Sequence, residues 1–236
     1  MSSDDSVFFT PTDEAVEAAR ARIAYFGRLL FDRHLTDAAG GNVSVRVGNR
    51  VCISPRFSGS HRQWQLDPDD VLVADLDRNI LKGSGQLSRE SNVHFKLHRE
   101  FGEAGTAVIH AHSRNILVFA AAACSMPPVL EATLKFGVTP AIEYAPAHHI
   151  KLAENVADSL RGREDRIKNQ AAAVIAPWHG LFLMGKDINA AFDAVERMDT
   201  NAYCILMGRL LVGSDAQARN EQMLVDSVNS FKAPTR

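Results

Sequence analysis

The sequence predicts a single domain of the α/β or α+β class with a largely antiparallel sheet. Helix-like and strand-like segments are mixed along all 236 residues, with no linker and no internal repeat. Two strand-like runs flank Gly48-Asn49, a hairpin pattern that favours antiparallel pairing. The apolar content of 46% is ordinary for a globular enzyme, and a chain of this length can bury a full core.

The first half of the chain is expected to form a helix, a hairpin, a third strand and a second helix. Apolar residues recur at helical spacing after Pro11-Thr12, and Ala39-Gly40-Gly41-Asn42 ends that pattern. Alternating apolar residues flank the hairpin turn, and another apolar run follows Asp67-Pro68-Asp69-Asp70. Ser88 is a candidate N-cap for the second helix. The expected elements are the helix 12–35, the strands 43–47, 50–53 and 71–74, and the helix 88–101.

The second half begins with an apolar run that indicates a strand, followed by an alanine-rich helix. A further helix, two strand-like runs around His179-Gly180 and a long closing helix come next. The expected elements are the strand 106–113, the helices 115–123 and 152–160, the strands 172–177 and 181–184, and the helix 187–212. Beyond Asp215 the tail is polar. We therefore expect one domain over residues 1–236, with loose ends at about 1–10 and 216–236.

Composition argues against several classes of protein. A net charge of -2 gives no support for a surface that binds nucleic acid or an anionic membrane. Cys52, Cys124 and Cys204 are odd in number and far apart, so we expect buried thiols in a reducing compartment, not disulfides. The first residues lack the pattern of a signal peptide, and no apolar run approaches about 18 residues. A cytoplasmic protein is expected.

Three histidines are the strongest candidates for a functional site. His110 and His112 lie two residues apart in a strand-like run, so both imidazoles project from the same face. His179, between two further strand-like runs, can supply a third nitrogen. Catalytic zinc takes three protein ligands at about 2.0–2.1 Å and keeps a fourth position open. The pattern favours a divalent-metal site, for zinc or manganese, because three imidazoles and a water suit both.

Other histidines leave alternatives open. Glu90, His94 and His98 recur every four residues and share one helix face, and a His-x-x-x-His pair on a helix can itself bind zinc. Buried imidazoles more often serve structure through hydrogen bonds, so we favour a core position for His94 and a solvated position for His98. His148 and His149 are neighbours in a loop, where adjacent side chains diverge. Glu90 lies in the first helical turn, where the helix dipole favours a carboxylate.

Two arginines near strand and helix ends are candidates for binding an anion. Arg56 follows Ser54-Pro55, and Arg89 lies between Ser88 and Glu90. Arginine clamps a phosphate or a carboxylate with two parallel hydrogen bonds. Because exposed arginines are usually only solvated, each of them alone is weak evidence.

Four motifs follow one another in a specific order and spacing between about residues 16 and 212. They are Gly41-Asn42-Val43-Ser44, Ile53-Ser54-Pro55, Ser88-Arg89-Glu90 with His94, and His110-Ala111-His112 with His179-Gly180. In this order they resemble the class II aldolase and adducin superfamily. The resemblance implies an α/β fold with three layers, α/β/α, around a central, mainly antiparallel sheet. It also implies a homotetramer with sites between neighbouring subunits.

The resemblance assigns roles to particular residues. His110, His112 and His179 match the metal ligands, and Glu90 matches the catalytic acid/base. The positions that match substrate-binding residues are Asn42, Ser54, Arg56, Ser88, Arg89 and Glu131. Some of these depart from the sugar-phosphate aldolases: Arg56-Phe57 stands where they have Thr-Gly, and Arg89 replaces a serine. Glu131 falls, by spacing, where a tyrosine protonates the leaving group.

The function expected from this resemblance is that of a carbon–carbon lyase. Our first expectation is aldol cleavage of a small ketose phosphate through a metal-bound enediolate. The two arginines suit an additional carboxylate at least as well, so the alternative is a metal-dependent decarboxylase of a hydroxylated aromatic or pyridine dicarboxylate, or of a keto acid. A third hypothesis is a non-catalytic adducin-like binding module, against which the intact histidine and glutamate set argues. The expected partners are a small anionic substrate and further copies of the chain, with no nucleic acid and no membrane.

Overall fold

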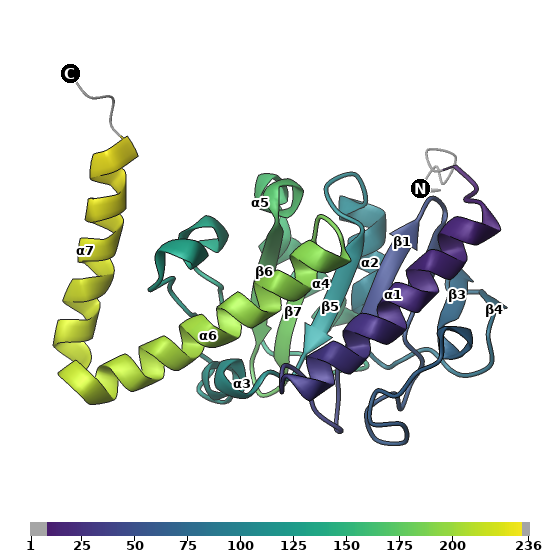
Figure 1. The fold of residues 1–236 in the computed structure, drawn as a ribbon, viewed down its shortest axis with the longest axis horizontal. Helices are drawn as coiled ribbons and strands as arrows, with labels where there is room; N and C mark the ends of the chain where they lie inside the picture. Colours follow the sequence, from purple (N-terminus) through teal and green to yellow (C-terminus); the bar gives the residue numbers. More distant parts are fainter. Residues whose placement is uncertain (1–8, 233–236) are drawn as a thin grey trace.

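A seven-stranded sheet forms the centre of the computed structural model, which describes residues 9–232 (Figure 1). The strand order is β4-β3-β2-β1-β5-β7-β6, and every neighbouring pair is antiparallel, as the sequence predicts. The strands are β1 (Asn42–Val47), β2 (Arg50–Ile53), β3 (Leu72–Asp75), β4 (Ile80–Lys82), β5 (Ala107–Ala111), β6 (Ala171–Ala176) and β7 (Gly180–Gly185).

Helices cover both faces of this sheet, which makes the three-layer arrangement that the resemblance implies (Figure 1). One layer contains α1 (Asp13–Asp32), α3 (Arg114–Ala121) and α6 (Ile188–Val212). The other contains α2 (Ser91–Phe101), α4 (Ile150–Leu160) and α5 (Glu164–Asn169). Two short 3-10 helices, η2 (Pro68–Asp70) and η3 (Glu131–Phe136), lie in connections, and α7 (Ser214–Lys232) extends away from the body.

Strand alternation decides which layer each side chain meets. Ile109 of β5 and Leu183 of β7 join the core under α1 and α6, whereas Val108 and Phe182 join the core under α2 and α4. His110 has the parity of Val108 and pairs across the ladder with Phe182. Its imidazole stacks on that phenyl ring, with centroids 4.1 Å apart and planes 10° apart. The sheet therefore holds this histidine rigidly on the α2 face.

The start of α2 differs from the sequence prediction. Its N-cap is Glu90, not Ser88, and the helix itself begins at Ser91. Ser88 lies in the preceding turn, where its Oγ accepts a hydrogen bond of 3.2 Å from the Glu90 backbone N–H. The carboxylate of Glu90 therefore lies at the N-terminus of α2, facing the sheet.

The C-terminal segment also differs from the prediction. A loose tail was expected beyond Asp215, but these residues form α7, whose Leu224 and Val228 are half-buried. At the other end, residues 9–12 have no regular structure, and the rest of the N-terminal segment expected to be loose lies outside the described residues. The short β4 and α5 carry too few residues for a periodic pattern and were not predicted.

Two further expectations concern cysteines and membranes. All three cysteines are free, but only Cys52 is buried; Cys124 is exposed and Cys204 is half-buried, which corrects the expectation of buried thiols. Within residues 9–232, no helix is both long and apolar enough to cross a bilayer.

Candidate active site

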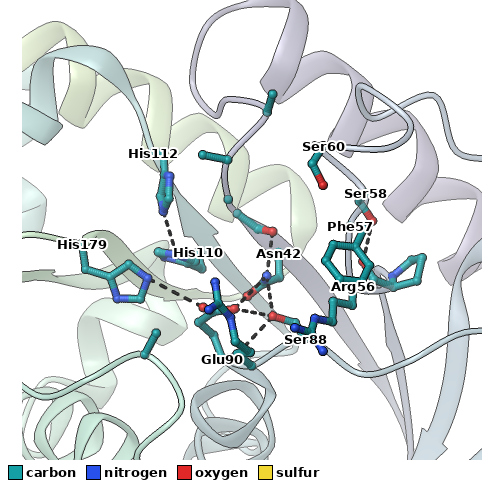
Figure 2. Close-up of a pocket in the computed structure, with 18 residues that line it drawn as sticks. Asn42, Arg56, Phe57, Ser58, Ser60, Ser88, Glu90, His110, His112 and His179 are labelled. Carbon is teal, nitrogen blue, oxygen red and sulfur yellow. Dashed lines mark hydrogen bonds and ion pairs between the residues drawn. The ribbon is translucent and has the colours of Figure 1, made fainter.

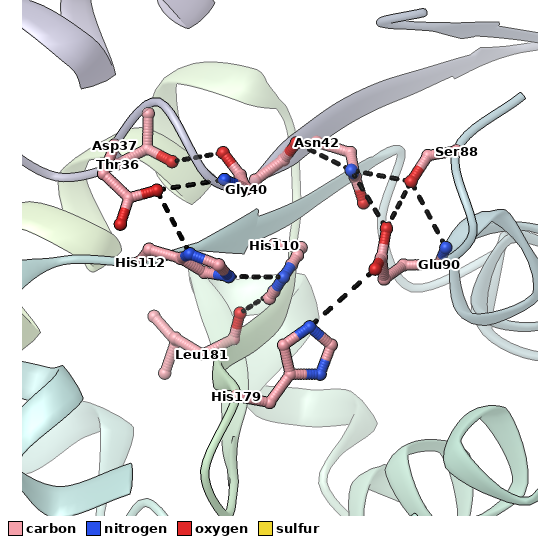
Figure 3. Close-up of polar contacts among 11 residues, drawn as sticks. Thr36, Asp37, Gly40, Asn42, Ser88, Glu90, His110, His112, His179 and Leu181 are labelled. Atoms are coloured by element: carbon pink, nitrogen blue, oxygen red, sulfur yellow. Dashed lines mark hydrogen bonds and ion pairs between the residues drawn. The ribbon is translucent and has the colours of Figure 1, made fainter. Parts of the chain in front are cut away.

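The three histidines singled out in the sequence converge at one end of the central strands. His110 lies in β5, His112 follows the end of that strand, and His179 lies in the connection between β6 and β7. Their candidate ligand atoms lie within 4.8 Å of one another, and the Nε2 atoms of His110 and His112 are 3.1 Å apart (Figure 3). Two ligands at about 2.0–2.1 Å from one tetrahedral ion would be roughly 3.3 Å apart. Among the described residues, this is the only such group of three side chains.

Hydrogen bonds to the far sides of two rings fix which nitrogen carries the proton. His110 Nδ1 lies 2.9 Å from the Leu181 carbonyl oxygen, and His112 Nδ1 lies 3.2 Å from Asp37 Oδ1 (Figure 3). Both partners only accept, so each Nδ1 donates, and in the neutral form of each ring Nε2 then presents a lone pair. Two lone pairs 3.1 Å apart repel unless a cation lies between them. This pattern, in which the second ring nitrogen is held by a carbonyl or carboxylate, is typical of metal-ligating histidine.

The charge states of the rings agree with this arrangement. Burial lowers the pKa of His110 well below its usual value, and burial lowers the pKa of His179 to about 4. Both imidazoles are therefore neutral near pH 7, the form that binds metal. Hydrogen bonding with His112 lowers the pKa of Asp37 and keeps this carboxylate ionised, despite the opposing effect of its partial burial.

Two glycines leave the space that the histidine rings occupy. A Cβ atom at Gly40 would lie 2.1 Å from His112 Cε1, and one at Gly180 would lie 2.7 Å from the Ala111 carbonyl oxygen. Gly180 also has φ of 155°, which side chains rarely adopt. Any larger residue at either position would push against the histidine cluster.

Glu90 faces this cluster across the pocket. Its Oε1 lies 3.8 Å from His179 Nε2, and its Oε2 accepts a short hydrogen bond from Ser88 Oγ (Figure 3). Asn42 Nδ2 donates to Ser88 Oγ at 2.9 Å and lies 3.5 Å from Glu90 Oε2. Burial raises the pKa of Glu90, but the hydrogen bonds from Ser88 and its own backbone, with the charge of Arg89, bring it below its usual value. Glu90 is therefore a carboxylate held by donors on one oxygen atom, with the other directed at the histidines.

A pocket of about 320 Å³ lies between this cluster and two loops. Figure 2 shows the histidines on one side and Arg56, Phe57 and Ser58 on the other, with Glu90 and Ser88 between them. Arg56 and Arg89 line the pocket, are exposed, and form no ion pair with any residue of the described chain. The Arg56 guanidinium lies 4.6 Å from the Phe57 ring centroid and donates to Gln86 at 3.3 Å. Phe57 adopts φ of 70°, a backbone conformation that is costly for an aromatic residue and common at functional sites.

The structure brings most, but not all, of the predicted substrate residues to the pocket. Asn42, Arg56, Ser88 and Arg89 line it, and the buried Asn42 Oδ1 has no partner among the described residues. Ser54 does not line it; its fully buried Oγ accepts from the Val43 backbone N–H at 3.0 Å, next to Asn42.

Glu131 is also placed elsewhere. It is exposed at the start of η3 and does not line this pocket within its own chain.

The alternative histidines have other environments. His94 and His98 are fully buried and both contact Ser44 Oγ, at 2.7 and 2.8 Å. The core position expected for His94 is confirmed, but the solvated position expected for His98 is wrong, because β1 lies against this face of α2 and covers it. His148 and His149 are exposed, and His149 Nδ1 accepts from the Lys151 backbone N–H at the start of α4.

Sequence reasoning missed several residues of the site. Asp37 holds His112, and Gly40 makes room for that ring, yet both belong to a short loop with no motif of its own. Phe57, Ser58 and Ser60 also line the pocket. Only the loop's position beside β5, which is set by tertiary structure, identifies Asp37.

Comparison with known proteins agrees with this site. Residues 21–206 match the family described as Class II Aldolase and Adducin N-terminal domain. An L-fuculose phosphate aldolase of Methanococcus maripaludis is 33% identical over 173 residues, which is 73% of this chain and 87% of the relative. A methylthioribulose-1-phosphate dehydratase of Pseudomonas savastanoi is 26% identical over 210 residues, 83% of this chain and 98% of the relative.

Solved structures show the same fold. An L-fuculose 1-phosphate aldolase superposes with a TM-score of 0.72 at 21% identity, covering 87% of this chain and 95% of that one. The relatives are named as aldolases and dehydratases, which sets aside a non-catalytic binding module. By sequence and by fold, this chain belongs to the class II aldolase and adducin family, and it is an enzyme, a lyase.

Proposed function

We propose that this lyase cleaves a carbon–carbon bond of a small ketose phosphate by retro-aldol chemistry, with a divalent metal. The observation that supports it best is the arrangement across the pocket: three histidines and the Glu90 carboxylate meet at one wall, and two arginines that form no ion pair among the described residues line the same cavity. A metal-binding group, a proton-transfer group and an anion-binding group are the three parts that such a reaction needs.

His110, His112 and His179 would hold the metal, because their ligand nitrogens converge and two rings are fixed with Nε2 facing inward. When bound, a divalent cation supplies Lewis-acid polarisation of a carbonyl oxygen and stabilises the negative charge that bond cleavage leaves. Three imidazoles with an open position suit zinc and manganese, and we propose one of these two.

Glu90 is proposed as the acid/base. Its oxygen atom beside His179 faces the space where a substrate carbon would lie, and the hydrogen bond from Ser88 to its other oxygen holds that orientation. As a carboxylate it accepts a proton in one half of the reaction and returns it to the carbon from which the aldehyde fragment has left. One well-placed group of this kind contributes typically 10²–10⁴-fold to the rate.

Arg56 and Arg89 are proposed to bind the anionic end of the substrate, with Asn42 and Ser88 contacting its hydroxyl groups. The relatives support a phosphate here, since their names specify L-fuculose phosphate, 5-deoxy-D-ribulose 1-phosphate and methylthioribulose-1-phosphate. Ser54 would act indirectly. Its Oγ accepts a hydrogen bond from the backbone N–H of Val43 in β1, the residue that follows Asn42.

The same two arginines favour a second candidate, a metal-dependent decarboxylase of a hydroxylated aromatic or pyridine dicarboxylate or of a keto acid. Two guanidinium groups in one pocket can bind two carboxylates as readily as one phosphate. The exposed Phe57 ring that also lines the pocket offers a surface for a planar substrate.

We further propose a homotetramer in which Glu131 completes a neighbouring subunit's site. The support is the position of Glu131, which is exposed and outside its own chain's pocket, together with the family resemblance.

A panel of both substrate classes tests the proposal. The zinc- or manganese-loaded enzyme should release a carbonyl fragment from a ketose 1-phosphate such as L-fuculose 1-phosphate, and no carbon dioxide from dicarboxylates. Glu90→Gln should keep its metal content and lose about 10²-fold or more in kcat. Carbon dioxide release without sugar-phosphate turnover would refute aldol cleavage and support the decarboxylase. Loss of metal in Glu90→Gln would show that Glu90 is a ligand instead.

A further inference from the structure

The contact between α2 and β1 is polar although it lies in the interior. Every fourth residue of the α2 segment and every second residue of β1 face one another along this seam. On the helix side these are Glu90, His94 and His98, and on the strand side Asn42, Ser44 and Arg46. All six are at most 8% exposed. The seam starts at the pocket, where Asn42 and Glu90 meet, and runs into the protein away from it.

Ser44 joins the two histidines of the seam. Its Oγ lies 2.7 Å from His94 Nδ1 and 2.8 Å from His98 Nε2. A hydroxyl has one proton, so Ser44 can donate to only one ring and must accept from the other. The three side chains therefore form a hydrogen-bond chain with a direction.

Charges at the two ends favour one direction. The carboxylate of Glu90 acts electrostatically on His94, and the guanidinium of Arg46 acts on His98. An N–H is favoured toward the anion and a lone pair toward the cation. The favoured order is therefore His98 Nε2–H to Ser44 Oγ and Ser44 Oγ–H to His94 Nδ1, which leaves the His94 proton on Nε2. Burial lowers the pKa of both histidines, so each ring carries a single proton.

The stability of the fold does not explain this chain of hydrogen bonds. His94 Nε2 and His98 Nδ1 are buried and have no hydrogen-bond partner among the described residues. The neighbouring positions of α2, such as Val93, Leu97 and Phe101, are apolar core residues. Apolar side chains of similar volume in place of buried polar groups often leave stability unchanged or raise it. A buried polar network is more apt to fix one arrangement of the elements that it joins.

We infer that Ser44, His94 and His98 are positioning residues, which fix the rotation of α2 against β1 and so hold the Glu90 carboxylate at the metal side of the pocket. Glu90 is the residue immediately before α2, so a rotation of the helix moves it directly. A shift of about 1 Å in a reacting group can cost on the order of 10² in rate. This inference rests on the proton-transfer role proposed for Glu90.

A pair of variants at His98, far along the seam from the pocket, tests the inference. His98→Leu removes the donor to Ser44 but fills the space, whereas His98→Gln keeps an amide N–H near the position of Nε2. We expect His98→Leu to lose at least about tenfold in kcat, with KM within threefold, normal metal content and an unchanged or raised Tm. His98→Gln should recover most of kcat. The control Leu97→Ala, on the apolar side of the same helix turn, should lower Tm and leave kcat unchanged.

These outcomes separate positioning from a structural role. A kcat loss that simply follows the fall in Tm, in His98→Leu and Leu97→Ala alike, would overturn the inference, as would full activity in His98→Leu. Glu90→Gln is measured beside them: if it stays active, the proposed function fails, and if it alone loses activity, only the positioning inference fails.

A neutron structure tests the direction of the chain without any substrate. It should show deuterium on Nε2 and none on Nδ1 of both His94 and His98, with the Ser44 deuterium directed at His94. Deuterium on Nδ1 of either ring would contradict the proposed order. This measurement also decides the case in which the His98 variants fail to fold.

Discussion

Replacing Gly40 with alanine should damage the metal site through one ring only. The new Cβ would lie 2.1 Å from His112 Cε1, and ordinary contact begins at 3.4 Å, so the ring must retreat by about 1.3 Å. Metal–ligand distances tolerate only about 0.2 Å. The φ of Gly40 lies outside the left-handed region, so alanine adds no backbone strain. Because even outer-shell changes cost about 10–100-fold in metal affinity, we expect a loss at or above the upper end of that range.

The assay is zinc titration against a chelator of known affinity, with circular dichroism to confirm folding. A double-mutant cycle with His112→Ala isolates the mechanism. Once the imidazole is gone, the added methyl group has nothing to displace, so Gly40→Ala should cost little in that background. Wild-type affinity in the single variant, or an equal loss in both backgrounds, would refute the steric argument.

Three other expectations follow from the site. Arg56→Ala and Arg89→Ala should each lose on the order of 10–10² in kcat/KM at constant metal content, since a charge-assisted hydrogen bond is worth about 1.5–3 kcal/mol; steady-state kinetics with metal analysis checks this. Burial lowers the pKa of His94 from 6.5 to about 4, so the unfolded chain alone binds this proton near pH 5. The free energy of unfolding should therefore fall by about 2 kcal/mol for this group between pH 7 and 5, and urea titrations should show that loss reduced in His94→Asn. Light scattering should find a tetramer, and steady-state kinetics should show lower activity in Glu131→Ala. An active monomer at micromolar concentration would contradict the role of Glu131.

Much of the site could be predicted because it is encoded in local periodicity. The spacing of two between His110 and His112 directs both rings to one side of an extended segment, whichever strands are its neighbours. The spacing of four from Glu90 to His94 likewise places them on one face of a helix. What surrounds them could not be predicted this way. The hydrogen bond between Ser44 and His94 forms because β1 lies against α2, and these two residues are 50 positions apart in the sequence.

The ends of the helices show a second limit of prediction from the sequence. Ser88 is a good N-cap by residue type, but its hydroxyl is used by Glu90, so the helix begins later than its composition suggests. The polar composition after Asp215 suggested a loose tail, but composition cannot exclude a solvated helix such as α7.

The two halves of the pocket are built on different structural elements. The histidines rest on β5 and on the tight connection between β6 and β7, whereas Arg56 and Arg89 project from irregular loops that follow β2 and precede α2. Loops accept substitutions and insertions that central strands do not. Evolution can therefore exchange the group that the pocket recognises and keep its metal chemistry intact. A library confined to residues 56–60 and 86–89 should consequently change substrate preference without loss of metal binding.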